Sequence, residues 1–141
     1  MTEQNWCDNV VTLCGSPKHI EELIEFVRGD DREMDFGHEW NSQREHGQVF
    51  TFTKIIPIEG TFDPAMRLAK WGCSGDAKNV AGECDSSYAR YRFITPACPP
   101  IPVSSALRLR FPDIFVCWFF CEPQNLHAGF LTSPQVYTGF L

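Results

Sequence analysis

The chain has 141 residues and a net charge of −6, which comes from eighteen acidic and twelve basic residues. This length suits one domain over residues 1–141, and a content of 43% hydrophobic and 13% aromatic residues excludes a largely disordered chain. The acidity, with no run of lysine and arginine, disfavours nucleic-acid binding through phosphates and suits contact with a basic protein surface.

The first residues and the cysteines predict a cytoplasmic protein without a metal or a cofactor. The start has no basic segment followed by an apolar core, and no stretch approaches the roughly 20 apolar residues that cross a membrane. Seven cysteines are spread along the chain without a CxxC pair or a neighbouring histidine, which excludes the usual zinc spacing. We therefore expect buried free thiols.

The first two elements are predicted to be a strand and a helix. Residues 9–15 form a short β-branched apolar run closed by a glycine, which indicates a buried strand. A helix follows, because Ser16 can cap it and Pro17 takes the favoured first position. The predicted core face of this helix is formed by Ile20, Leu23, Ile24 and Val27.

Residues 29–47 are predicted to leave the core as a polar excursion. His38 and His46 each stand next to a glutamate, which a metal or acid-base site could use. We prefer a solvated loop, because connecting segments of this polarity lie on the surface. Trp40 is one of the few apolar anchors in this excursion and is a candidate binding residue.

The middle of the chain is predicted to hold a strand and a short helix. Residues 49–57 alternate β-branched and aromatic side chains, which is typical of a strand. The short helix begins at Pro64 after the cap Asp63 and ends at Gly72. The glycine-rich segment that follows is expected to hold at most a brief strand at residues 78–80, and it lacks a phosphate-loop pattern.

Residues 88–95 alternate again and predict a strand with two distinct faces. Arg90 and Arg92 fall on one face and form the one basic patch of the sequence. A solvated sheet face is the preferred explanation of this patch. A nucleotide bound by these arginines or by Lys78 is the alternative.

Residues 94–114 hold five of the ten prolines, which suits a linker, a recognition peptide or a rigid joint. We predict a joint, because a strand precedes the prolines and a helix at residues 103–110 follows them. The next strand, at residues 114–122, is apolar on both faces, which predicts a central or doubly covered position. A turn and one or two terminal strands complete the chain.

This order of elements predicts an α+β fold of the ferredoxin-like sandwich type. Short links between strands and helices give a mainly antiparallel sheet, with two helices on one face and a short third helix. The alternation within the strands implies that the second face is open, unless the polar excursion or a partner covers it.

Several short segments follow one another at a characteristic spacing. They contain Asn5, Trp6, Cys7 and Asn9, then Ile56 and Pro57, Trp71, Gly72, Asp76 and Ala77, Pro99 and Pro100, Phe111 and Pro112, Glu122, and Ala128 with Gly129. In this order they resemble the YubB-type ferredoxin-like proteins of phages, prophages and conjugative plasmids. Residues 73–75 and 97–98 depart from the family pattern, which has Thr-Lys-Trp and Trp-Ser there. The resemblance implies a fold and a mobile-element origin but no particular activity.

The leading functional hypothesis is a small acidic protein that acts by protein-protein contact. Together with the resemblance, it suggests an inhibitor of a host defence system, similar to anti-CRISPR proteins, that binds a basic surface on a host or mobile-element complex. A nucleotide- or nucleic-acid-binding module is one alternative. An enzyme is another, with Cys98, His127 and Glu122 meeting at one edge of the sheet, although Cys98 has no glycine elbow or helix start to activate it.

Two tryptophans give a further hypothesis about binding. Trp6 and Trp71 could form an aromatic platform for a base or a peptide, but we prefer core packing with each N–H satisfied by a carbonyl. The candidate binding residues from the sequence are Trp6, Trp40, Trp71, Asp76, Arg90, Arg92, Glu122 and His127.

Overall fold

The computed structural model describes residues 5–28, 40–41, 49–58, 63–132 and 136–140. The strands are β1 (Trp6–Cys14), β2 (Trp40–Asn41), β3 (Lys78–Cys84), β4 (Tyr88–Pro96), β5 (Phe115–Glu122), β6 (His127–Leu131) and β7 (Val136–Phe140). They form one antiparallel sheet in the order β2-β3-β4-β1-β5-β6-β7. The helices are α1 (Pro17–Val27), α2 (Phe52–Ile55), α3 (Pro64–Trp71), α4 (Ile101–Arg110) and the 3-10 turn η1 (Pro123–Asn125). The predicted α+β class is therefore confirmed.

Helices α1 and α3 begin and end where the sequence predicts. The Ser16 hydroxyl accepts the backbone N–H of His19 at 3.3 Å, and all four predicted core residues of α1 are buried. The Asp63 carboxylate accepts the N–H of Ala65 in the same way at the start of α3. Gly72 ends α3 with φ +86°, the left-handed conformation that glycine adopts without strain.

The predicted second strand at residues 49–57 is wrong, because this segment contains the single-turn helix α2. Its residues do not alternate in burial: Val49, Phe50 and Phe52 are all fully buried. The N–H of Thr51 donates to the carbonyl of Val27 at 2.9 Å, so this N–H binds the end of α1 and not a neighbouring strand. The aromatic and β-branched residues of this segment pack into the core, although the segment forms a helical turn and not a strand.

The sheet has one buried face and one face that no described helix covers. On β4 the buried side chains are those of Ala89, Tyr91, Phe93 and Thr95, as the alternation predicts. On β5 only alternate residues are buried, while Phe115 at its start is 69% exposed. Strand β5 lies inside the sheet, between β1 and β6, but it is not covered on both faces by the described residues.

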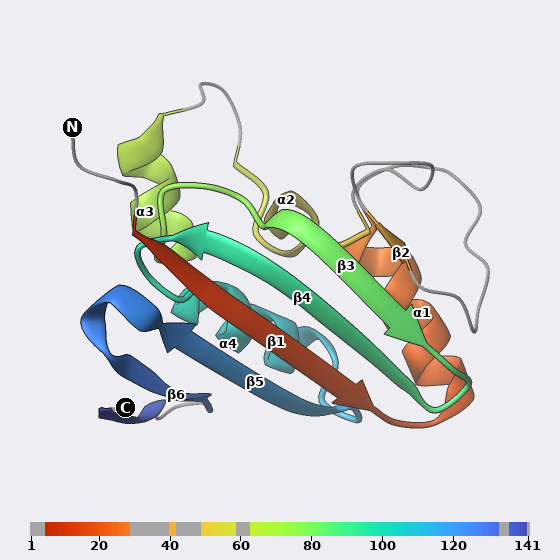
Figure 1. Cartoon of the computed structure of the whole chain (residues 1–141). Helices are drawn as coiled ribbons and strands as arrows, with labels where there is room; N and C mark the ends of the chain where they lie inside the picture. Colours follow the sequence, from red (N-terminus) through yellow and green to blue (C-terminus); the bar gives the residue numbers. More distant parts are fainter. Residues whose placement is uncertain (1–4, 29–39, 42–48, 59–62, 133–135, 141) are drawn as a thin grey trace.

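The arrangement of layers is visible in Figure 1, which looks onto the uncovered face of the sheet. Helices α1 and α4 lie behind the strands, and α3 lies at the rim of the sheet. The strand β3 is longer than expected and has an irregularity between Lys78 and Ala81, where Asn79 takes a positive φ of 55°. This irregularity interrupts the local alternation, which is why the sequence indicated only a brief strand.

The proline-rich segment is the connection between β4 and α4, as predicted for a rigid joint. The N–H of Ala97 is bonded to the carbonyl of Asn5 at 2.8 Å, which ties the joint to the beginning of β1. Helix α4 begins at Ile101, two residues before the predicted start at Val103, and Pro102 lies in its first turn. The joint therefore extends the pairing of β4 with β1 at one end and starts the helix at the other.

Candidate functional site

The predicted Glu122 and His127 form a close pair at one end of the sheet. They face each other across β5 and β6, joined by the turn η1, and the Glu122 Oε2 lies 3.0 Å from the His127 Nδ1. The Glu122 side chain is 14% exposed and that of His127 is 29% exposed. A carboxylate that orients an imidazole is one component of many catalytic sites, and such a site also needs a nucleophile in reach.

Cys98 and Cys7 are not suited to nucleophilic chemistry. Burial and then the charge of Glu122 raise the pKa of Cys98 above its ordinary value. The same two causes, again with burial first, raise the pKa of Cys7 to about 12. A catalytic cysteine needs a lowered pKa, because the thiolate is the reactive form. The structure thus places Cys98 in the electrostatic range of Glu122 but gives its thiol the wrong environment for an enzyme.

A buried polar network near this end of the sheet was missed by the sequence analysis. Asn9 is 1% exposed and donates from Nδ2 to the carbonyl of Cys7 and to the hydroxyl of Thr95, both at 3.1 Å. Its Oδ1 accepts the indole N–H of Trp118 at 3.0 Å, and the Thr95 hydroxyl donates to the carbonyl of Cys98 at 2.7 Å. The network joins β1, β4, β5 and the proline joint, and each polar atom named here has a partner.

Asp76 and Trp71, both predicted as binding residues, serve the core. The Asp76 carboxylate accepts the N–H groups of Phe52 and Ala77 and the hydroxyl of Thr51. It therefore fixes the start of α2, and burial raises its pKa although these hydrogen bonds act in the opposite direction. Trp71 is 3% exposed and donates its N–H to the carbonyl of Ile56 at 2.9 Å, which confirms the core interpretation for this residue.

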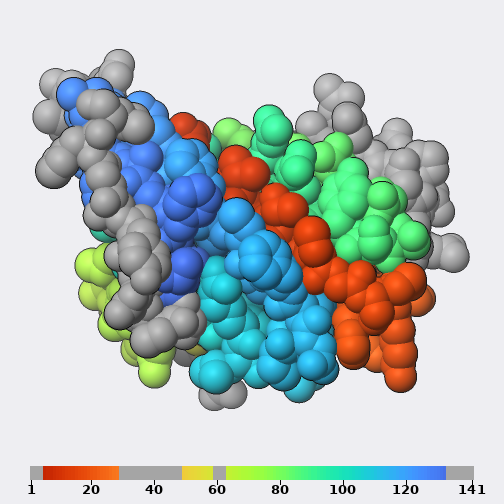
Figure 2. All heavy atoms as spheres, turned by 90° about the horizontal axis from the view of Figure 1, so that it is seen from below, coloured from red at the N-terminus to blue at the C-terminus, as the bar shows by residue number. Residues whose placement is uncertain are grey.

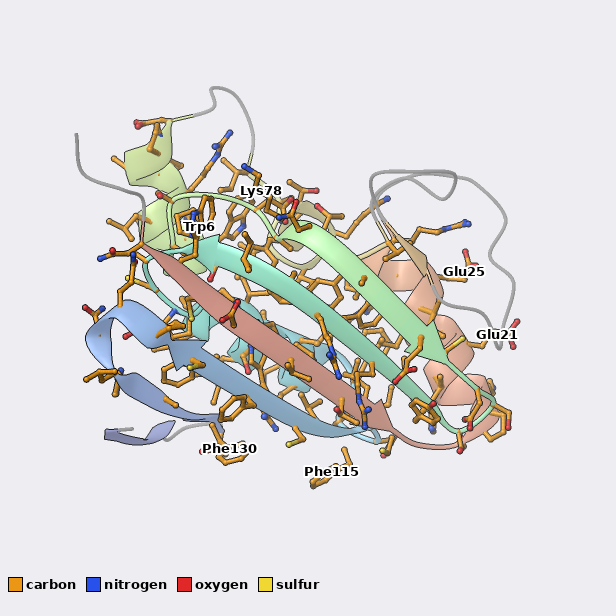
Figure 3. All side chains as sticks on the ribbon, in the orientation of Figure 1. Trp6, Glu21, Glu25, Lys78, Phe115 and Phe130 are labelled. Atoms are coloured by element: carbon orange, nitrogen blue, oxygen red, sulfur yellow. The ribbon has the colours of Figure 1, made fainter. Side chains whose placement is uncertain are left out.

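Trp6, the other member of the predicted platform, is not buried as Trp71 is. Trp6 is partly exposed, and the Lys78 ammonium lies over its ring at 5.1 Å from the ring centre, as the labelled side chains in Figure 3 show. Trp40 lies opposite Gly82 in the pairing of β2 with β3, but its side chain is outside the described residues. His38 and His46, and nearly all of the predicted excursion, also lie outside them.

The two predicted arginines lie on the uncovered face of the sheet, on the strand β4. Arg90 donates to the hydroxyl of Thr12 at 3.2 Å and pairs with the carboxylate of Glu83 at 3.3 Å. Arg92 is exposed, and it forms no ion pair with any other residue that the structure describes. The basic patch is therefore half neutralised, which weakens it as a phosphate site.

The acidic residues are concentrated in one part of the sequence, which the overall charge did not reveal. Between Glu21 and Glu45 the sequence has nine acidic and three basic residues, so this segment carries a charge of −6 and the rest of the chain is neutral. Within it, Glu21, Glu22 and Glu25 are exposed on α1. Counting charge by segment would have found this feature from the sequence alone.

A cleft of about 370 Å³ lies between the beginning of α1 and the turn from α4 to β5. The His19 Nδ1 lies 2.9 Å from the Ser16 hydroxyl, and its Nε2 lies 3.9 Å from the Asp113 carboxylate. This order of serine, histidine and aspartate is similar to a hydrolase triad, but the Ser16 hydroxyl is engaged as the cap of α1. With Glu22 and Arg110 also in the lining, the cleft has no predominant charge to select a ligand.

All seven cysteines are free thiols, but the prediction that they are buried holds for only three of them. Cys7, Cys73 and Cys84 are buried, Cys14 is exposed, and Cys98, Cys117 and Cys121 are intermediate. Within the described ranges, no group of histidine, cysteine, aspartate and glutamate residues could hold a metal ion. No helix in this part of the chain is long and apolar enough to cross a membrane.

Comparison of the chain with family models, with curated proteins and with solved structures finds no match. The resemblance to the YubB-type proteins therefore stays a prediction. The motif residues that carry it have structural roles in this chain, since Asn9, Trp71, Gly72 and Asp76 pack, cap or connect elements.

Proposed function

We propose that this chain is a small binding protein that acts by contact with a basic protein surface. The observation that carries the proposal is the separation of charge: the whole net charge of −6 falls between Glu21 and Glu45. On α1, Glu21 and Glu25 stand one helical turn apart and are both exposed (Figure 3), and the Glu25 carboxylate is also paired with Arg28 at 2.8 Å. Like charges four residues apart destabilise a helix slightly, so an acidic surface here has a cost that binding would offset.

The narrower proposal is an inhibitor of a host defence system, encoded by a phage or plasmid. It is supported by the small size, by the local acidity and by the resemblance to mobile-element proteins. Defence complexes that hold nucleic acid expose basic channels, and a concentrated acidic surface can compete for such a channel.

We also propose that the fold has the ferredoxin-like architecture. Its support is the central strand order β3-β4-β1-β5, in which each connection through α1 or α4 passes over one intervening strand.

The environment of the alternative sites favours binding over catalysis. The enzyme hypothesis requires a reactive Cys98, and burial together with Glu122 raises the pKa of this thiol. The nucleotide hypothesis requires free basic groups, and Arg90 is already bonded to Thr12 and Glu83. A thermal shift with nucleotides or a single-stranded oligonucleotide that disappears in Arg92→Ala would support the nucleotide hypothesis instead.

The test is co-purification of the tagged chain with a purified defence complex of its host, at low and at high salt. The proposal predicts association that weakens with salt and is abolished by Glu21→Lys combined with Glu25→Lys. The matched control is Glu83→Lys combined with Asp113→Lys, which changes the net charge equally but on other surfaces. Absence of association, or association that both double variants reduce equally, would contradict the proposal.

A further inference from the structure

An apolar strip runs along the uncovered face of the sheet on β5 and β6. Cross-strand pairing places Phe119 between Val10 on β1 and Phe130 on β6, and the rings of Phe119 and Phe130 lie 5.4 Å apart. Phe130 is 46% exposed, and Phe115 is exposed at the beginning of β5. The strip consists of Val10, Phe115, Cys117, Phe119, Cys121 and Phe130.

The strip faces open space in the described part of the chain. Phe115 and Phe130 project beyond the lower strands of the sheet in Figure 3. In the view from below, the atoms of β5 are exposed between those of β1 and α4 (Figure 2). Contiguous apolar surface on a sheet face is costly in water, and in folded proteins it usually marks an interface.

The residues beside the strip include one acidic and one basic side chain, so this surface can form ion pairs with the same surface of a second copy. Asp8 on β1 and Arg92 on β4 are exposed on the same face of the sheet. Asp8 pairs with Ile94 and Val10 pairs with Arg92, so the two charges are diagonal neighbours in the sheet. No ion pair joins them to each other or to the rest of the described chain. A two-fold axis through this face can place each Asp8 opposite the Arg92 of a second copy.

The charge on this face also argues against nucleic acid as the occupant. Its described charged residues are Lys78, Arg90 and Arg92 against Asp8 and Glu83, so it is nearly neutral. The acidic helix α1 lies behind the sheet (Figure 1), so two copies that meet through their uncovered faces keep these helices apart. Two sheets can pack face to face at about 10 Å with their side chains interdigitated.

From these observations we infer that two copies of the chain pair through the uncovered sheet face, apolar strip against apolar strip, with Asp8 of each copy opposite Arg92 of the other. The dimer presents its two acidic α1 surfaces outward. This inference is independent of the proposed function, because pairing requires no other protein.

The test is the molar mass of the purified chain by light scattering and sedimentation over a range of concentrations, with a reductant present to keep Cys117 and Cys121 free. We expect twice the 16.1 kDa mass of one chain. Phe130→Asp should weaken the dimer by about 30-fold or more, since it puts a charge into the centre of an apolar interface. The control is Leu109→Asp, an exposed apolar residue on α4, which should leave the dimer intact.

The charge pair gives the sharper test of the geometry. Asp8→Arg alone and Arg92→Asp alone should each weaken the dimer by about tenfold, and the two together should restore it. Circular dichroism confirms that each variant is folded. The inference is overturned by a monomer at all concentrations, by a dimer that Phe130→Asp leaves unchanged, or by charge variants whose effects add rather than cancel. Oligonucleotide binding that Phe130→Asp abolishes would also overturn it.

Discussion

Replacing Asn9 by leucine tests whether the buried network holds the sheet together. Leucine has the same branched arrangement of four side-chain heavy atoms, so the change removes the hydrogen bonds without leaving a cavity. Asn9 donates to the carbonyl of Cys7 and the hydroxyl of Thr95, and accepts the indole N–H of Trp118. Because Asn9 is 1% exposed, water cannot replace these partners.

The size of the effect follows from the groups that lose a partner. An orphaned buried N–H such as that of Trp118 costs about 1–3 kcal/mol, and each further hydrogen bond contributes about 1 kcal/mol. The greater hydrophobicity of leucine offsets about 1 kcal/mol of this sum. We therefore expect Asn9→Leu to lower the free energy of unfolding by about 3 kcal/mol, which is a large part of the stability of a domain of this size.

The assay is urea denaturation of the wild type, Asn9→Leu, Trp118→Phe and the double variant. Trp118→Phe removes the donor itself, so in the double variant no indole N–H is left without an acceptor. The double variant should thus be about 1–2 kcal/mol more stable than the sum of the single effects predicts. If the two changes are additive within about 0.5 kcal/mol, the hydrogen bond between them contributes nothing and the reasoning is refuted.

Two further predictions concern the glycine at the end of α3 and the buried thiols. Gly72→Ala should lower the free energy of unfolding by about 2 kcal/mol, because φ is +86° and the new Cβ would lie 2.7 Å from the Cδ of Pro102. Gly75→Ala, whose Cβ would meet Pro96 at 3.2 Å, is the control in the same thermal melts, and an equal loss in both would contradict this account. Burial raises the pKa of Cys7 and of Cys73 from 9.0 to about 12, so these thiols ionise more readily in the unfolded chain. The contribution of each thiol to the free energy of unfolding should be fully present below pH 9 and should fall by about 1.4 kcal/mol per pH unit between pH 9 and 12. In Cys7→Ala the free energy of unfolding should fall less steeply with pH, and an unchanged slope would exclude this cause.

The limits of α1 and α3 could be predicted from the sequence because their signals are local. A capping side chain, a proline in the first turn and a glycine after the last turn act on neighbouring backbone groups, as at Ser16, Pro17 and Gly72. The alternation of β4 is local in the same sense, since successive side chains of a strand must point to opposite faces. These features needed no knowledge of the rest of the chain.

The helical turn α2 could not be predicted, because a distant residue decides it. The carboxylate of Asp76 accepts the N–H of Phe52 across 24 positions of sequence and overrides the strand preference of the local residues. The convergence of Asn9, Thr95 and Trp118 is likewise a product of sheet register. Single-sequence patterns report which residues are apolar or polar, but not which ones pairing will bring together.

The sequence by itself determined the α+β class, the capped helices and the charge of −6, since composition and local backbone chemistry specify these directly. Only the tertiary structure decided that Asp76 fixes the helical turn α2 and that Asn9 meets Trp118 in a buried network. It also placed the apolar strip of β5 and β6 and the acidic face of α1 on separate surfaces. The reason is physical: burial and proximity depend on contacts between residues far apart in the chain, and the folded sheet creates those contacts.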